Sequence, residues 1–261
     1  MALNFNGATA QVDFGSGSTI DDLATLTIMF VFKATTLDST FRYLLRKFTV
    51  GVGGINVNSH DSILEFTRAY TAQATNLTAV SSTTISTGTW YIAFFVDGGA
   101  NVAPHIYYAA VGSALAEVSY TTQTTPLGTL DTDAAASALV GFRDATRRWV
   151  GDISTFAMWA EAMTIGQCRE AYYSFYPSAN LKVFSHLGYA GTGTQPDWSG
   201  HFNTGAVTAA TVSPHAPLQV WGGALSYSPY VVAAAGGDPE GLLIGGKLLR
   251  RGLLGGVLVA A

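Results

Sequence analysis

The chain has 261 residues and a formal net charge of −4; only 11% of its residues are charged, whereas 48% are hydrophobic. This length is sufficient for one large β domain, or for a domain with an appendage. The acidic balance disfavours a nucleic-acid surface, which needs a basic patch. Few charges are available to keep a free monomer soluble, so the composition favours assembly with other subunits.

A single cysteine, Cys168, excludes an internal disulfide framework. The first seven residues contain neither a basic segment nor a long apolar run, so we expect no signal peptide. The segment 242–261 comes nearest to a membrane span, but three basic residues lie in its middle, where they are most costly. We therefore expect no membrane partner.

Residues 1–160 alternate apolar and polar side chains with a period of two, interrupted by turn residues, which is typical of β-strands. The segments 26–33 and 90–96 are the strongest, and the nearly continuous apolar run of residues 26–33 predicts a central strand covered on both faces. Asp97-Gly98-Gly99 then forms a turn, and residues 105–111 are expected to pair with 90–96.

One short helix is expected over residues 164–172. Thr164 can accept a hydrogen bond from the backbone N–H of Gln167, and the Gln167 side chain can reach back, which together make a capping box. Ile165, Cys168 and Tyr172 recur at helical spacing and form one apolar face. Cys168 is therefore expected to be a small core residue and not a reactive thiol.

The character of the sequence changes after residue 177. Residues 178–229 are polar and irregular and are expected to form a strap on or beside the preceding domain, whereas residues 230–261 are a glycine- and leucine-rich arm. Frequent glycines disfavour a helix in the arm, and its apolar side chains would leave a large sticky patch in water. Burial against another subunit or another protein is favoured over packing on its own domain or contact with a membrane. The expected assembly interface consists of Leu242, Leu243, Ile244, Leu248, Leu249, Leu253, Leu254, Val257 and Leu258.

Several motifs, in their order and spacing, give residues 1–177 a recognisable outline. They are the opening Leu3-Asn4-Phe5-Asn6-Gly7, the later Thr87-Gly88-Thr89-Trp90, and the closing Gly151-Asp152-Ile153 with Trp159 and the short helix. This outline resembles that of laminin-G-like (concanavalin A-like) jelly-roll domains. The resemblance implies an all-β, two-sheet antiparallel jelly-roll sandwich with one short helix, followed here by an extended C-terminal arm.

The resemblance also bears on function, because domains of this type usually bind and do not catalyse. The glycine-leucine arm is similar to C-terminal segments of tailed-phage virion proteins that carry such domains. This second resemblance implies a non-enzymatic structural protein of a phage particle, a capsid decoration or fibre or spike component located in the virion. Its partners would be other copies of itself or other virion proteins, held through the arm.

A glycan-binding, lectin-like adhesion module is the alternative. Sugar binding uses an exposed aromatic side chain for stacking with polar groups beside it, and Trp198 next to Asp197 and Ser199 fits this pattern, as does Trp221. The competing interpretation is that both tryptophans anchor the strap onto the sandwich.

Catalytic and metal-binding patterns are weak. A glycoside hydrolase needs two carboxylates directed into one groove, and the acidic pair Asp131 and Asp133 lies in a turn-like context, so a degenerate hydrolase is the least favoured alternative. The histidines do not have the spacing of metal ligands. We expect no cofactor; calcium through the loop residues Asp97, Asp131 and Asp133 is the open alternative, against which they are ordinary turn residues.

Overall fold

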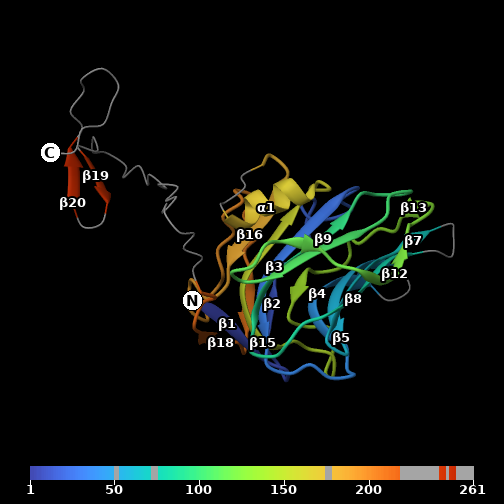
Figure 1. The fold of residues 1–261 in the computed structure, drawn as a ribbon, viewed down its shortest axis with the longest axis horizontal. Helices are drawn as coiled ribbons and strands as arrows, with labels where there is room; N and C mark the ends of the chain where they lie inside the picture. Colours follow the sequence, from blue (N-terminus) through green and yellow to red (C-terminus); the bar gives the residue numbers. More distant parts are fainter. Residues whose placement is uncertain (50–52, 72–75, 174–177, 218–240, 245–246, 251–261) are drawn as a thin grey trace, which may run out of the picture. The chain divides into compact units, whose positions relative to one another are not determined.

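The structure is a computed structural model that describes residues 1–49, 53–71, 76–173, 178–217, 241–244 and 247–250 (Figure 1). The chain divides into two compact units, Met1–Gln219 and Val220–Ala261. Among the described residues, no helix has the length and apolar character required to cross a membrane.

The first unit is built from two eight-stranded antiparallel sheets, which we call sheet A and sheet B. Sheet A runs in the order β11 (Ala116–Glu117), β10 (His105–Ala110), β9 (Trp90–Asp97), β3 (Leu26–Ala34), β15 (Val150–Trp159), β1 (Ala2–Asn6) and β18 (Thr211–Ser213), and β16 (Leu181–His186) also pairs with β15. Sheet B runs in the order β12 (Tyr120–Thr124), β8 (Leu77–Thr84), β6 (Ile63–Arg68), β5 (Gly53–His60), β4 (Arg42–Thr49), β14 (Leu139–Val140), β2 (Gln11–Asp13) and β17 (Ala206–Thr208). A short ribbon joins β7 (Tyr70–Thr71) to β13 (Thr129–Leu130).

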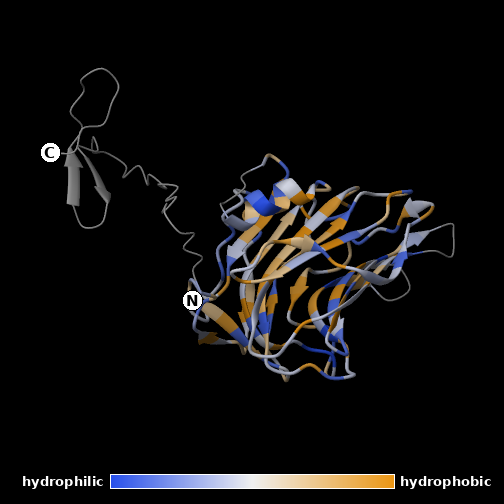
Figure 2. Ribbon diagram, viewed as in Figure 1, coloured by the Kyte–Doolittle hydropathy of each residue, from blue (hydrophilic) through white to orange (hydrophobic). Residues whose placement is uncertain are grey.

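The main core lies between the two sheets, and Figure 2 shows the hydrophobic residues concentrated along their strands. Strand β3 sends every second side chain into this core, including Phe30 and Phe32. Phe30 stacks on Phe156 of β15 with ring centroids 5.1 Å apart, and Phe156 also contacts Phe14. Burial of each such ring stabilises the fold by about 2 kcal/mol. The apolar residues that recur at every second position of the sequence are thus the residues that form the core.

A second apolar cluster covers the other face of sheet A, beneath helix α1 (Ile165–Tyr173). It contains Met29, Phe94 and Trp159 from the sheet and Cys168 from the helix. Strands β3 and β9 are thus covered on both faces, as the nearly continuous apolar run of residues 26–33 predicted for β3. The expected pairing of β9 with β10 is also confirmed, with Phe94 opposite Tyr107.

The predicted capping box is confirmed at the start of α1. The backbone N–H of Gln167 donates to Oγ1 of Thr164 at 3.3 Å, and the backbone N–H of Thr164 donates to Oε1 of Gln167 at 2.8 Å. Cys168 is fully buried, and burial raises the pKa of its thiol to about 12. Cys168 is therefore a core residue, and a thiol with so high a pKa is a poor nucleophile at neutral pH.

Residues 178–217 belong to the first unit and contribute strands to both sheets. The expected irregular strap contains β16, which pairs with β15 of sheet A, as well as β17 at the edge of sheet B and β18 at the edge of sheet A. Between these strands the chain forms the loop 187–205, which carries the predicted residues Asp197 and Trp198.

The described part of the second unit is an antiparallel ribbon of β19 (Gly241–Ile244) and β20 (Lys247–Arg250). Its register pairs Leu242 with Leu249 and Leu243 with Leu248. Five of the nine predicted interface residues lie in this ribbon, whereas Leu253, Leu254, Val257 and Leu258 lie outside the described residues, as does Trp221.

Candidate functional site

Three large aromatic side chains of the loop 187–205 reach solvent. Tyr189 is 62% exposed, Trp198 is 40% exposed and Phe202 is 84% exposed. The rings of Tyr189 and Trp198 meet edge to face, with centroids 5.3 Å apart and an interplanar angle of 87°. We call these three residues the aromatic surface. Exposed aromatic side chains grouped in one loop are unusual, because burial of each would stabilise the fold.

The carboxylate of Asp197 organises this loop from within. Its Oδ1 accepts hydrogen bonds from the backbone N–H groups of Phe184 and Ser199, and its Oδ2 accepts from the Ser199 hydroxyl and the Asn203 N–H, at 2.8–3.0 Å. The backbone N–H of Trp198 donates to the carbonyl of Phe184 at 2.7 Å, which ties the loop to β16. These bonds fix the backbone on both sides of Trp198.

A second polar anchor holds the part of the loop that carries Tyr189. Gln195 is fully buried, and its side-chain oxygen accepts from the N–H of Gly188 at 2.7 Å. Its side-chain amide donates to the carbonyls of Gly191 and Gly193, and its backbone pairs with Gly205. A buried amide with its hydrogen-bonding groups satisfied gives the loop one well-defined shape.

The two predicted sugar-binding residues of this loop, Asp197 and Trp198, thus differ in their surroundings. The Trp198 ring is directed outward, whereas both oxygens of Asp197 are engaged inside the loop. Sequence reasoning missed Tyr189 and Phe202. The available signal was that both aromatic residues lie in a glycine-, threonine- and proline-rich stretch with no strand periodicity, where a core position is not expected.

Two of the three acidic residues considered for calcium, Asp97 and Asp133, form ion pairs with basic side chains. Asp97 is fully buried and forms an ion pair with Arg68, and it also accepts a hydrogen bond from the hydroxyl of Tyr70. Burial and the charge of Asp97 raise the pKa of Tyr70. Asp133 forms an ion pair with the fully buried Lys47 at 2.7 Å. In these two places a guanidinium and an ammonium supply the positive charge that a cation would bring.

Asp131 lies next to the same region, in the turn before Asp133, and its backbone N–H donates to the carbonyl of Ala69. Within the described ranges, no three His, Cys, Asp or Glu side chains are close enough to one another to hold a metal ion.

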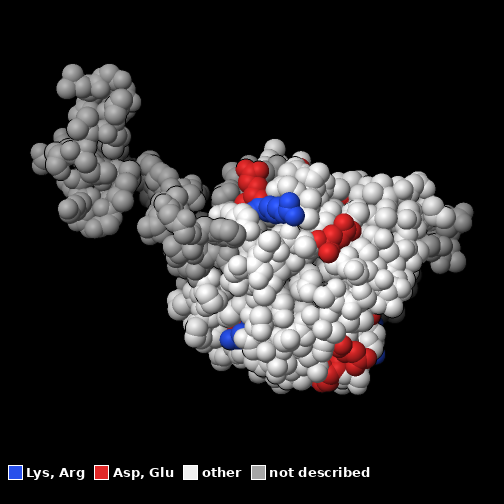
Figure 3. Space-filling view, in the orientation of Figure 1, with Lys and Arg blue, Asp and Glu red and all other residues white. Residues whose placement is uncertain are grey.

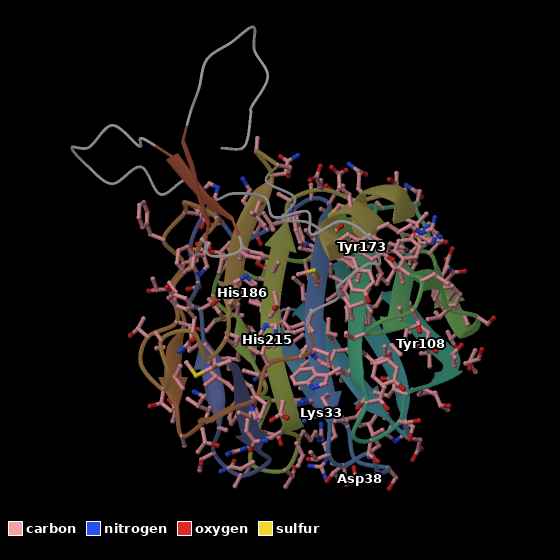
Figure 4. All side chains as sticks on the ribbon, turned by 60° about the vertical axis from the view of Figure 1, so that its left-hand side comes forward. Lys33, Asp38, Tyr108, Tyr173, His186 and His215 are labelled. Carbon is pink, nitrogen blue, oxygen red and sulfur yellow. The ribbon has the colours of Figure 1, made fainter. Side chains whose placement is uncertain are left out.

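A polar row crosses the outer face of sheet A, where Figure 4 labels Lys33, His186 and His215. Nζ of Lys33 lies 2.6 Å from Oδ2 of Asp152 and 5.0 Å from the ring centroid of Trp90. Asp152 also accepts a hydrogen bond from Asn4. The charge of Lys33 is therefore paired within the protein.

The two histidines of this face, His186 and His215, have ring centroids 6.4 Å apart. Although His186 is an exposed residue, loss of hydration around its imidazole lowers its pKa, and His215 lowers this pKa further. The neutral imidazole is therefore the favoured form in the folded protein.

No protein-family model matches the chain, and no curated protein matches it in sequence. Its structure is similar to that of a candidate carbohydrate-binding protein from Bacteroides ovatus, with 17% identity and a TM-score of 0.58 over 80% of this chain and 58% of that one. It is also similar to the binding domain of Paraclostridial Mosquitocidal Protein 1, with 11% identity and a TM-score of 0.50 over 66% and 45% of the two chains. The LG1–3 region of the laminin α2 chain matches at 13% identity and a TM-score of 0.46, over 63% and 32%.

The fold is an all-β, two-sheet antiparallel jelly-roll sandwich. The expected fold class is thereby confirmed, at the level of architecture. The chain spans less than two thirds of the length of the Bacteroides ovatus protein, and sequence identities of this size speak to the fold alone.

Proposed function

We propose that this jelly roll is a non-catalytic carbohydrate-binding module and that its aromatic surface binds sugar rings. The observation that carries the proposal is the exposure of Trp198 and Tyr189 on a loop whose backbone is fixed by Asp197 and Gln195. The similarity in fold to a candidate carbohydrate-binding protein supports it.

The chemistry of a sugar ring matches such a surface. One face of a pyranose carries C–H groups that can pack on an aromatic ring, while its edge carries hydroxyls that need hydrogen-bond partners. Trp198 offers the ring face, and the exposed Tyr189 offers a phenolic hydroxyl. Because the loop is already ordered, less conformational entropy is lost on binding.

A glycan array with matched variants tests this proposal. Trp198→Ala is expected to abolish sugar-dependent signal, and Tyr189→Ala to weaken it. Tyr189→Phe separates the ring from its hydroxyl. Tyr173→Ala, which removes a 42% exposed aromatic side chain from α1, is the control and is expected to bind like the wild type. A wild-type protein without any sugar-dependent signal would refute the proposal.

A second function is a structural role in a phage particle through the C-terminal arm. The ribbon β19–β20 favours it, because its register pairs leucine with leucine at two successive positions, Leu242 with Leu249 and Leu243 with Leu248. An isolated two-stranded ribbon is marginally stable in water, so contact with a neighbouring subunit or virion protein would stabilise it.

The two functions are compatible, because an arm that attaches the module to a particle leaves the jelly roll free to bind a surface glycan. Neither function requires the chain to be an enzyme. Turnover of a polysaccharide by the purified protein would contradict both accounts.

A further inference from the structure

Arginine side chains gather on one part of sheet B and the loop beside it. Arg42 and Arg46 lie on β4, and three more arginines lie in the loop between β14 and β15. Backbone carbonyls link the two groups, because Arg42 donates to the carbonyl of Arg148 and Arg46 to that of Arg143. We call Arg42, Arg46, Arg143, Arg147 and Arg148 the arginine cluster. It holds five of the 13 Lys and Arg residues of an acidic protein, whereas the face shown in Figure 3 carries only scattered charges.

Among the described residues, two carboxylates form ion pairs with these five guanidinium groups. Asp38 binds Arg42 through both of its oxygens. Oδ2 of Asp144 lies 3.7 Å from Nε of Arg143 and 3.9 Å from Nε of Arg147. Within the described residues, Arg46 and Arg148 have no carboxylate within ion-pair distance. The cluster therefore has an excess of positive charge.

Two of its N–H donors are buried and have no hydrogen-bond acceptor in the structure. They are Nε of Arg46 and Nη1 of Arg148. Burial lowers the pKa of Arg46, and the neighbouring charge of Arg143 lowers it further. Like charges held this close repel one another, so an anion bound at the accessible side of the cluster would relieve the repulsion.

Aromatic rings hold three of these guanidinium groups in place. The guanidinium carbon lies 4.9 Å from the Tyr43 ring for Arg143, 4.7 Å from the Phe142 ring for Arg148 and 5.7 Å from the Phe48 ring for Arg46. Stacked arginines are already ordered, and the planar fork of a guanidinium matches the two oxygens of a carboxylate or a sulfate. The cluster is thus built for an oxoanion and not only for a diffuse negative potential.

We propose that the arginine cluster binds the oxoanions, carboxylate or sulfate, of an acidic polysaccharide. A nucleic acid fits less well, because its continuous polyphosphate chain calls for a basic stripe along a protein of high pI, whereas this protein has a pI of about 5.6 and one compact cluster. The ligand class follows the proposed carbohydrate function, but the site is separate from the aromatic surface and is tested separately.

Binding to immobilised polymers tests the proposal with the full chain. The probes are dextran sulfate, polygalacturonate, neutral dextran and a DNA duplex similar in length to the polysaccharide chains. We expect the wild type to bind one or both acidic polysaccharides, with affinity that falls as salt rises, and not to bind neutral dextran. The oxoanion is identified by which acidic polymer binds more tightly.

Two charge-preserving variants distinguish the contribution of the planar guanidinium group from that of its positive charge. Arg46→Lys and Arg148→Lys are each expected to weaken binding about tenfold, because a lysine cannot bind an oxoanion in a bidentate manner. The matched control is Arg169→Lys, which makes the same change on α1 and is expected to have no effect. Thermal unfolding of each variant verifies that it is folded.

Three outcomes would overturn the proposal. One is the failure of the wild type to bind either acidic polysaccharide, which needs no variant. Another is equal affinity for DNA, which would indicate a general polyanion surface. The third is equal weakening by Arg169→Lys. Trp198→Ala is expected to leave acidic-polymer binding unchanged, so a failure of the aromatic-surface proposal and a failure of this one give different results.

Discussion

Arg68 of β6 and Asp97 of β9 form an ion pair that joins sheet B to sheet A, with 2.6 Å between Nη1 and Oδ2 and both side chains fully buried. The guanidinium also donates to the carbonyl of Leu23, and Asp97 accepts from Tyr70. The inner space between the sheets therefore contains a hydrogen-bonded charge pair as well as apolar side chains.

Removal of one partner of this buried pair should destabilise the protein far more than removal of one partner of a more exposed ion pair. Arg68→Met leaves the carboxylate of Asp97 buried without its cation, and we expect the free energy of unfolding to fall by about 3–5 kcal/mol. Arg42→Met, which breaks the more exposed pair with Asp38, should cost about 1 kcal/mol or less. Urea unfolding measures both. Similar losses in the two variants would contradict the inferred importance of the buried pair.

Gly151, in the motif Gly151-Asp152-Ile153, is expected to tolerate no side chain. It has φ of +145°, and a Cβ placed on it would lie 2.1 Å from the carbonyl oxygen of Lys33 on the neighbouring strand. Gly151→Ala should therefore destabilise the protein by about 3 kcal/mol or more, through strain and a clash with backbone. The control is Gly17→Ala, where a Cβ meets nothing within 4 Å. Equal midpoints for the two variants in thermal unfolding would be inconsistent with the described geometry.

His186 is expected to make stability depend on pH. Its pKa in the folded protein lies below the ordinary value of 6.5, because of lost hydration and the neighbouring His215 and amino terminus. The unfolded chain therefore binds the proton more readily, so this contribution is complete above about pH 6.5 and is lost as the pH falls below it. His186→Asn should flatten that part of the stability profile relative to the wild type, as measured by urea unfolding between pH 5 and 8. His201→Asn is the control. If this variant flattened the stability profile as much as His186→Asn, His186 would not be the source of the pH dependence.

Asp197 should act on ligand binding through the shape of its loop, because its oxygens already accept four hydrogen bonds. Asp197→Ala removes these bonds, and we expect it to weaken glycan binding while also increasing hydrogen exchange of the Ser199 and Asn203 amides. Trp198→Ala should weaken binding without that increase in exchange. If Asp197→Ala reduced binding with no change in exchange, a direct contact with the sugar would be the better explanation.

The sequence was most informative where neighbouring residues determine the structure. The apolar runs of β3 and β9, the β9–β10 pair and the Thr164–Gln167 capping box follow from periodicity and local chemistry. The pairs Arg68–Asp97 and Lys47–Asp133 could not be predicted, because their members are 29 and 86 residues apart and meet only when the sheets pack. The strands β16, β17 and β18 were missed for a related reason. They are short or lie at sheet edges, and the partner strands, not local periodicity, define them.

Deletion of residues 238–261 tests the role of the arm. The register of the β19–β20 ribbon pairs Leu242 with Leu249 and Leu243 with Leu248, and a two-stranded ribbon by itself is marginally stable in water. If a second copy or a virion protein provides it, the truncated chain should no longer assemble but should retain the circular dichroism and unfolding midpoint of the jelly roll. Light scattering of the full and truncated proteins measures assembly, and cosedimentation with particles measures incorporation. A matched variant, Leu243→Ser with Leu248→Ser, should mimic the deletion because it removes one apolar pair while keeping the chain length. Normal assembly of the truncated protein would exclude the arm as the attachment element, since the jelly roll alone would then carry the contact.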